Sequence, residues 1–266
     1  MFVEHKERFS HSKFKDRLAQ ALGLWSFAEL CQTRTMRFPP FLHTQFLSMM
    51  QQTEHNYREL FHIYTFDVRN RLQLEATFQG DVYDPRTDTV ASVDWDIQDQ
   101  VYYALDAHTH PYVSLEDLNR KHISNHISEE LGLFSQQQTF VYENIYFTYF
   151  SGDDLRDWKT WSTQILSEVL ITHSRLLWLI NPYYPKILHK ERDSETFYDQ
   201  ETEDITWRFL QNMIHTGAST IDYKFFYHEV DKALLRFCNT RGYLAFTNSD
   251  LRSNQLQRLL WSDFLT

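Results

Sequence analysis

Two neighbouring apolar segments place the strongest constraint on how this chain can fold. Residues 59–68 and 71–80 are rich in β-branched and aromatic side chains, and residues 67–70 supply a polar turn between them. Such a pair is typical of a β-hairpin. Further apolar segments favour strands that extend the hairpin into a sheet, at residues 89–95, 100–110 and 138–150.

The rest of the chain favours helices, because 266 residues contain only six glycines and six prolines. Apolar residues recur at helical spacing in residues 16–32 and 41–57, and RFPP forms a break between them. A helical pattern returns at residues 114–131. We expect a long helix over residues 155–180, whose stripe, which includes Trp158 and Trp161, packs in the core.

The C-terminal residues predict a polar loop followed by a mostly helical part. Residues 186–204 are polar and favour an exposed loop, and two helices and a short strand are expected from 205 to 248. Helices followed by a short hairpin are also the elements of a winged helix. The predicted fold is therefore α+β, a mixed β-sheet with flanking helices and a mostly helical C-terminal part. We expect a helical lead-in, a central domain and a C-terminal docking domain, at residues 1–40, 41–152 and 153–266.

Charge and cysteine content exclude several classes of protein. The net charge of −10 argues against non-specific phosphate binding, so direct contact with nucleic acid is not expected. Cys31 and Cys238 are the only cysteines, so neither a disulfide framework nor a cysteine zinc site is indicated. The charged N-terminus resembles no secretion signal, and no apolar run is long enough to span a membrane. A cytoplasmic protein is the resulting expectation.

The sequence HTHPYVSLED, residues 108–117, contains the strongest candidate for chemistry. His108 and His110 are two residues apart at the end of a predicted strand, so both imidazoles point to one face and can reach one metal. Asp117 lies in the first turn of the following predicted helix and can supply a third ligand. Two histidines and a carboxylate leave the fourth position of a zinc ion open for water, which is typical of catalytic zinc.

Other interpretations of the same residues have to be weighed. Ser114 with Asp117 three residues later is also a helix capping signature. His122 and His126, four residues apart, are alternative ligands together with Glu130, although such residues are common on surface helices. The run LDAHTHP also resembles the first-strand signature of barrel amidohydrolases, but too little chain follows it to build such a barrel.

The order of these elements resembles the RadC-like branch of the JAMM (MPN-plus) metalloprotease superfamily. Glu59 opens the first strand, NRL makes the hairpin turn, and Gly80 ends the second strand. His108, His110 and Pro111 then follow, and after them Ser114 and Asp117. The resemblance covers about residues 41–152, and the loop between His110 and Asp117 is shorter than in the family.

The resemblance implies a function for each of these residues. His108, His110 and Asp117 are expected to bind Zn²⁺, with Glu59 as the general base that passes a proton to the leaving amine. Ser114 is expected to help stabilise the oxyanion formed during attack on an amide. Glu75 and Glu116 are weaker candidates for the base. Glu75 does not match the family's position, and Glu116, next to Asp117 on the predicted helix, should point about 100° away from the metal.

Two functions remain open at this stage. The first is a zinc-dependent metallopeptidase or isopeptidase whose partner is a protein substrate, with ubiquitin-like conjugates among the candidates. The second is a non-catalytic interaction module of a mobile-element, defence or DNA-processing assembly, in which the C-terminal helices bind a partner protein. Glu59 together with both histidines favours the enzyme, because a scaffold has no need of all three.

Overall fold

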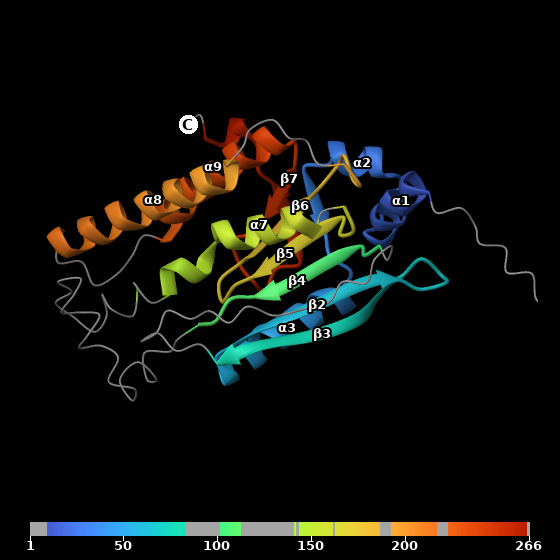
Figure 1. The fold of residues 1–266 in the computed structure, drawn as a ribbon, viewed down its shortest axis with the longest axis horizontal. Coiled ribbons are helices and arrows are strands. Elements are labelled where there is room, and N and C mark those ends of the chain that lie inside the picture. Colours follow the sequence, from blue (N-terminus) through green and yellow to red (C-terminus); the bar gives the residue numbers. More distant parts are fainter. Residues whose placement is uncertain are drawn as a thin grey trace, which may run out of the picture.

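One mixed sheet of eight strands forms the centre of the protein (Figure 1). The computed structural model describes residues 10–82, 102–112, 141, 144–161, 163–186, 193–216 and 223–264. The strand order is β1-β8-β7-β6-β5-β4-β2-β3, and all neighbours are antiparallel except β4 and β5. The strands are β1 Thr35–Arg37, β2 Arg58–Phe66, β3 Leu72–Val82, β4 Leu105–Thr109, β5 Ser167–Ile171, β6 Leu176–Ile180, β7 Leu244–Thr247 and β8 Gln255–Arg258.

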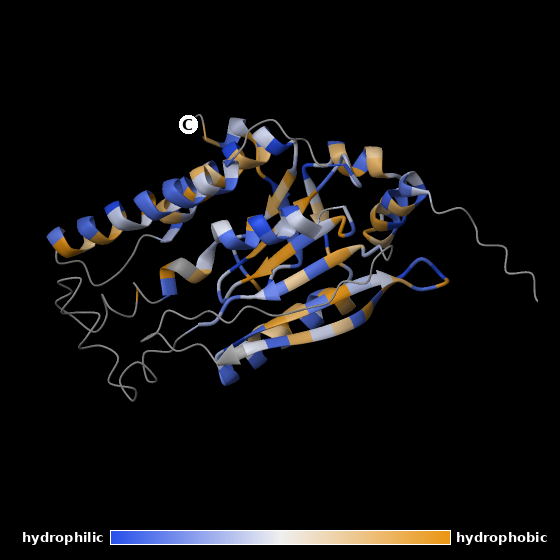
Figure 2. Ribbon diagram, in the orientation of Figure 1, coloured by the Kyte–Doolittle hydropathy of each residue, from blue (hydrophilic) through white to orange (hydrophobic). Residues whose placement is uncertain are grey.

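Helices cover both faces of the sheet and create two hydrophobic cores. Alternation along β6 separates them, because Trp178 lies in the core shared with the N-terminal helices, whereas Leu177 and Leu179 lie in the core shared with α7, α8 and α9. Hydrophobic residues predominate along the central strands, and α8 carries many hydrophilic ones (Figure 2). The helices are α1 His11–Ala21, α2 Phe27–Gln32, α3 Pro40–Asn56, α7 Gly152–Trp161, α8 Ser194–Thr216 and α9 Tyr223–Arg241, with 3₁₀ turns η1 Tyr146–Thr148 and η2 Trp261–Phe264. The predicted fold class, a mixed sheet with flanking helices and a helical C-terminal part, is confirmed.

The predicted hairpin is present as β2 and β3, within two residues of the expected limits. Asp67 builds the turn, since its carboxylate accepts hydrogen bonds from the backbone N–H groups of Arg69 and Arg71, both at 2.8 Å. Asn70 adopts a φ of 60°, which asparagine tolerates better than most residues. The residues of the turn and the composition of the two strands therefore both favour the hairpin that is observed.

The first predicted helix is divided into two. Residues 16–32 fall in α1 and α2, with Gly23 between them at a φ of 82°. Ser26 then caps α2, because its hydroxyl accepts a hydrogen bond from the Glu29 N–H at 3.3 Å. The RFPP segment acts as predicted, since α3 begins at Pro40, and the short strand β1 that precedes it pairs with β8.

The long helix predicted over residues 155–180 is wrong. Helix α7 ends at Trp161, and the following residues form the antiparallel strands β5 and β6. Every residue of both strands is buried, so their sequences carry no alternation of apolar and polar residues that would distinguish them from a buried helix. Trp158 lies in the core as expected, with its ring centroid 4.5 Å from that of Tyr243.

Two other predictions need correction, and two lie outside the described residues. The described part of 138–150 contains helical residues and η1 instead of a strand. The loop predicted at 186–204 is helical from Ser194 onward, because α8 buries Tyr198 and Thr202 on one side while exposing Glu203 and Asp204 on the other. The strand predicted at 89–95 and the helix predicted at 114–131 fall outside the part of the chain that the structure describes.

The C-terminal part shares the central sheet with the other two parts. Helices α8 and α9 are followed by β7 and β8, which pair with β6 and β1, so all three predicted segments contribute strands to one sheet. The predicted strand at 243–248 is present as β7, and the hairpin it forms belongs to this sheet. Among the described helices, none combines the length and the apolar composition needed to cross a membrane.

A buried ion pair joins α8 to α9 and provides a test of this packing. Arg241 Nη2 donates to both carboxylate oxygens of Glu195, at 2.7 and 2.9 Å, and both side chains are almost fully buried. We expect Arg241→Met to lower the free energy of unfolding by about 3 kcal/mol, because it leaves Glu195 buried without its main partner. Urea denaturation measures this, and adding Glu195→Leu is expected to recover most of the loss. A double variant as unstable as the single one would contradict the explanation.

Candidate metal centre

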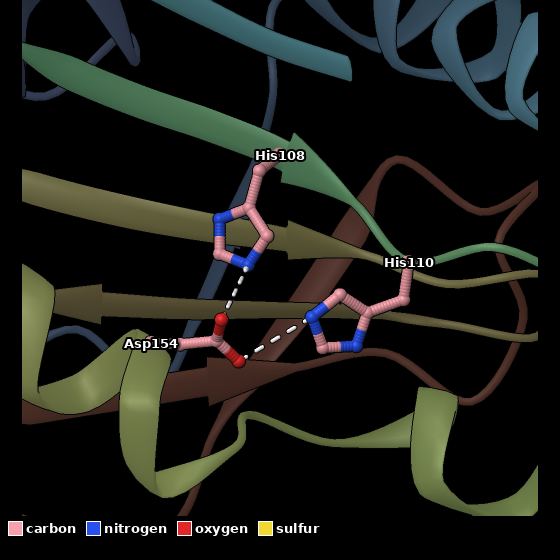
Figure 3. Close-up of side chains that lie close together, drawn as sticks. All are labelled: His108, His110 and Asp154. Atoms are coloured by element: carbon pink, nitrogen blue, oxygen red, sulfur yellow. Dashed lines mark ion pairs between the residues drawn. The ribbon is translucent and has the colours of Figure 1, made fainter. Parts of the chain in front are cut away.

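His108 and His110 lie at the end of β4, in the interior of the sheet. Strand β2 pairs with β4 on one side, with Phe61 opposite His108, and β5 pairs on the other, with Leu170 beside His108. Alternation places both imidazoles on the face that α7 covers, and both are buried (Figure 3). The Phe61 ring is stacked on that of His108, with centroids 5.2 Å apart, so the ring has little freedom to tilt.

Asp154 faces both imidazoles from the first turn of α7. Its Oδ1 lies 3.8 Å from His108 Nε2, and its Oδ2 lies 3.3 Å from His110 Nε2 (Figure 3). Ligand atoms of the three residues lie within 4.8 Å of one another, which is close enough for one metal ion. The Asp154 side chain is 19% exposed, so the group is reached by solvent from the α7 side.

Hydrogen bonds at the start of α7 fix the Asp154 carboxylate. The Ser151 N–H donates to Asp154 Oδ2 at 2.6 Å, and the Asp154 N–H donates to Ser151 Oγ at 3.1 Å, which together form a capping box. Helix α8 holds the same turn, because Asp199 Oδ1 accepts a hydrogen bond from the Gly152 N–H at 3.0 Å. A Cβ at position 152 would lie 2.6 Å from Asp199 Cγ, so this close approach requires glycine.

The sequence predicted Asp117 as the third ligand, whereas Asp154 is the carboxylate that lies beside the two histidines in the structure. Asp117, Ser114, and the alternative residues His122, His126 and Glu130 lie outside the described residues. A sequence signal for Asp154 exists, because Ser151 and Asp154 repeat the Ser-x-x-Asp spacing of Ser114 and Asp117. These residues were expected only to precede the helix predicted over residues 155–180.

Glu59 lies on the same side of the sheet as the histidines. It is two residues before Phe61 on β2, and Phe61 pairs with His108, so alternation places Glu59 on the histidine face next to His110. Burial raises the pKa of Glu59 to about 8, with a smaller contribution in the same direction from Asp154 and an opposing one from His110. Of the other carboxylates considered as bases, Glu75 is exposed on β3, and Glu116 lies outside the described residues.

Burial and charge give the two histidines different properties. Burial lowers the pKa of His108 to about 4, so this ring is neutral near pH 7 and carries a free lone pair. Burial also acts to lower the pKa of His110, but Asp154 and Glu59 outweigh it and the pKa is raised. In return, the histidines hold the pKa of Asp154 below its usual range despite burial. Neither nitrogen of His108 has a hydrogen-bond partner among the described residues, which fits a metal ligand.

A second pair of acids lies behind His108. Asp106 on β4 and Glu168 on β5 are register partners, and both are buried. Glu168 Oε1 lies 3.5 Å from His108 Nδ1, and atoms of Asp106, His108 and Glu168 lie within 4.8 Å of one another. Burial raises the pKa of both carboxyl groups, that of Asp106 to about 8. The sequence analysis did not single out either acid.

Comparison with protein-family models, curated proteins and solved structures finds no match to this chain. The metal site is therefore inferred from the arrangement of the side chains alone. Buried groups of histidine and carboxylate side chains are present that can hold a metal ion, as in a metal-dependent hydrolase.

Asp154 and its neighbour Asp153 form a matched pair for testing the third ligand. Asp154→Ala is expected to weaken divalent-metal binding more than about 100-fold, because it removes one of three ligands. Asp153→Ala should leave the affinity unchanged, since this exposed side chain pairs with Arg156. Competition with a chromophoric chelator measures both. Asp117→Ala completes the set, and a loss in that variant with none in Asp154→Ala would assign the third ligand to Asp117.

The raised pKa of Glu59 predicts how the metal-free protein responds to pH. In the folded state Glu59 keeps its proton up to about pH 8, whereas its ordinary value is 4.5. The folded state therefore binds more protons between these values, and Glu59 makes stability fall as pH rises by up to about 1.4 kcal/mol per unit. Glu59→Gln removes this dependence, so its stability advantage over the metal-free wild type should grow from pH 5 to pH 7.5. Denaturation at several pH values measures it, and a constant difference would contradict the burial of an acid.

Proposed function

We propose that the protein is a zinc-dependent hydrolase that cleaves an amide bond in a protein or a ubiquitin-like conjugate. The observation that carries the proposal is the convergence of His108, His110 and Asp154, with Glu59 on the neighbouring strand of the same face. Three protein ligands and a nearby carboxylate that is not one of them are the parts needed for metal-assisted hydrolysis.

The ligand set favours zinc over harder cations. Two imidazole nitrogens and one carboxylate oxygen suit a borderline metal, whereas Mg²⁺ and Ca²⁺ prefer oxygen ligands alone. A zinc ion held here would act as a Lewis acid that polarises the amide carbonyl and makes water a better nucleophile. The rings of Phe61, Phe147 and Phe150 lie within 6.1 Å of the imidazoles, measured between centroids, and lower the local polarity.

Glu59 is the residue to which we assign proton transfer. Its burial, and its pKa raised to about 8, make the carboxyl group able both to accept and to release a proton near neutral pH. In the proposed reaction Glu59 takes a proton from the attacking water and transfers it to the nitrogen of the leaving amine. The peptide C–N bond then breaks, giving a carboxylate and an amine.

Ser151 takes the role that the sequence analysis gave to Ser114. The Ser151 hydroxyl oxygen accepts a hydrogen bond from the Asp154 N–H, so its own hydrogen can be donated elsewhere. Because Ser151 is hydrogen-bonded to Asp154, we assign this hydrogen to the stabilisation of the negative oxygen that develops when the amide carbonyl is attacked.

The order of the elements supports a JAMM-like assignment from Glu59 to Asp154. A glutamate near the start of a strand, a hairpin, a His-x-His-Pro strand end and a Ser-x-x-Asp helix start follow in sequence. The Ser-x-x-Asp motif then lies at Ser151–Asp154. A long insertion after Pro111 precedes it, in place of the short loop between His110 and Asp117. Partner binding through the C-terminal helices stays a prediction, for which exposed Phe197, Trp207 and Phe225 on α8 and α9 are the candidates.

The proposal is tested by metal content and turnover measured on the same preparations. Wild type is expected to contain about one zinc per chain and to cleave lysine-linked diubiquitin or members of a fluorogenic peptide library. Glu59→Gln should keep the zinc and lower turnover by at least about 100-fold, whereas His108→Ala should lose the zinc. Glu75→Gln is the matched control, because Glu75 is an exposed glutamate on the adjacent strand.

Two results would reject the proposal. A wild-type protein that binds no zinc would favour the interaction module, and full turnover in Glu59→Gln would show that Glu59 is not the base.

A further inference from the structure

The two nitrogens of His108 face different carboxylates. His108 Nε2 lies 3.8 Å from Asp154, on the side of His110, whereas Nδ1 lies 3.5 Å from Glu168 on β5. The two carboxylates approach the ring from different elements, Asp154 from α7 and Glu168 from β5, whereas His108 itself is on β4. The ring therefore has a side that faces the metal group and a side that faces Glu168.

A neutral imidazole has one N–H and one lone pair, so its two sides cannot play the same role. If Nδ1 carries the hydrogen, it can donate to Glu168, and the lone pair of Nε2 then points towards Asp154 and His110. The opposite tautomer would place a hydrogen at Nε2, where a metal ion needs a lone pair. Only one tautomer of His108 therefore serves metal binding at this site.

We propose that Glu168 is a positioning residue that holds His108 in the tautomer and orientation needed for metal binding. The inference rests on the proposed metal site of His108, His110 and Asp154. The Nδ1···Oε1 distance of 3.5 Å shortens to a normal hydrogen bond by a shift of a few tenths of an ångström. Metal-bound histidines generally donate their second N–H to a carboxylate, a backbone carbonyl or water in this way.

The surroundings favour Glu168 in this role. Glu168 is almost fully buried, so water does not compete for its oxygen, and Glu168 Oε2 has no hydrogen-bond partner among the described residues. Stacking of Phe61 on the imidazole limits the tilt of the His108 ring and so keeps Nδ1 near Glu168. Asp106 lies beside Glu168 as its register partner, on the same strand as His108.

The same three groups, Asp106, His108 and Glu168, also meet the distance requirement for a second cation. Binding one there while Nε2 binds the first would require His108 to lose its remaining ring hydrogen. Glu168 can accept a hydrogen bond from His108 Nδ1 without such a change. A positioning role for Glu168 is therefore the simpler explanation of these distances.

The inference is tested with Glu168→Leu, which removes the acceptor, and Glu168→Gln, which keeps a carbonyl oxygen at a similar position. The first readout is zinc affinity by chelator competition. We expect Glu168→Leu to weaken binding by about 10–100-fold and Glu168→Gln to recover most of the loss. Glu75→Leu is the control, because it makes the same change at an exposed glutamate on β3 and should leave the affinity unchanged.

The second readout is the tautomer of His108 in the metal-free protein, from the ¹⁵N chemical shifts of its ring nitrogens. Wild type and Glu168→Gln should carry the hydrogen at Nδ1, and Glu168→Leu should give a mixture of tautomers. A variant that unfolds would also give a mixture of tautomers, as histidine does in water, so the shifts are compared only between preparations whose circular dichroism matches that of wild type.

The outcomes separate this inference from the proposed function. A wild type that binds no zinc rejects the proposed metal site and this inference with it. Zinc binding in wild type that is equally tight in Glu168→Leu, with Nδ1 still protonated, overturns only the role of Glu168. Two zinc ions in wild type and one in Glu168→Leu would also overturn it, because Glu168 would then be a ligand.

Discussion

The placement of β4 between β2 and β5 determines where the two histidines and the acids on the neighbouring strands lie. Because β2 is antiparallel to β4 and β5 is parallel to it, both flanking strands bring an acidic residue to the histidine face, Glu59 from one side and Glu168 from the other. A one-residue shift in the register of either strand pair would move these side chains to the opposite face of the sheet. The opposite face is packed against α3, where Thr109 and Thr53 share a hydrogen bond of 2.6 Å, and this contact fixes the orientation of β4.

Asp154, the remaining candidate ligand, is positioned by the start of α7. The C-terminal helices α8 and α9 hold that start in place. Asp154 lies in the first turn of α7, where its own hydrogen bond to the Ser151 N–H orients it towards the histidines. Asp199 of α8 holds Gly152, and Glu195 of the same helix is bound by Arg241 of α9. Polar contacts on α8 thus connect α9 to the start of α7, where Asp154 lies. This is a structural reason for the C-terminal part to be present in a protein whose chemistry is elsewhere.

The sequence was most informative where local chemistry alone decides the structure. The β2–β3 hairpin follows from Asp67 and Asn70 in its turn, and the common face of His108 and His110 follows from strand alternation. Residues 167–180 could not be assigned correctly, because strands buried on both faces have no periodicity that separates them from a helix. Asp154 was missed for a different reason. A long stretch of chain separates it from His110, and sequence spacing alone does not show which of two Ser-x-x-Asp motifs returns to the strand end.

The charges around His108 give a physical reason for a cation at this site that does not depend on any resemblance. The charged groups that act on Glu168 are Asp106, Asp154 and Asp157, all of them acidic, and Asp154 also acts on Glu59. Concentrating carboxylates in a buried site is unfavourable unless protons or a cation offset their charge. In the metal-free protein this cost raises the pKa values of Glu59 and Asp106, so both carboxyl groups keep their protons to a higher pH. A divalent ion between His108, His110 and Asp154 reverses the sign of the local field and favours ionised carboxylates around it. Metal binding at this site would therefore be coupled to proton release, and Glu59, the proposed base, is one of the groups that would lose a proton.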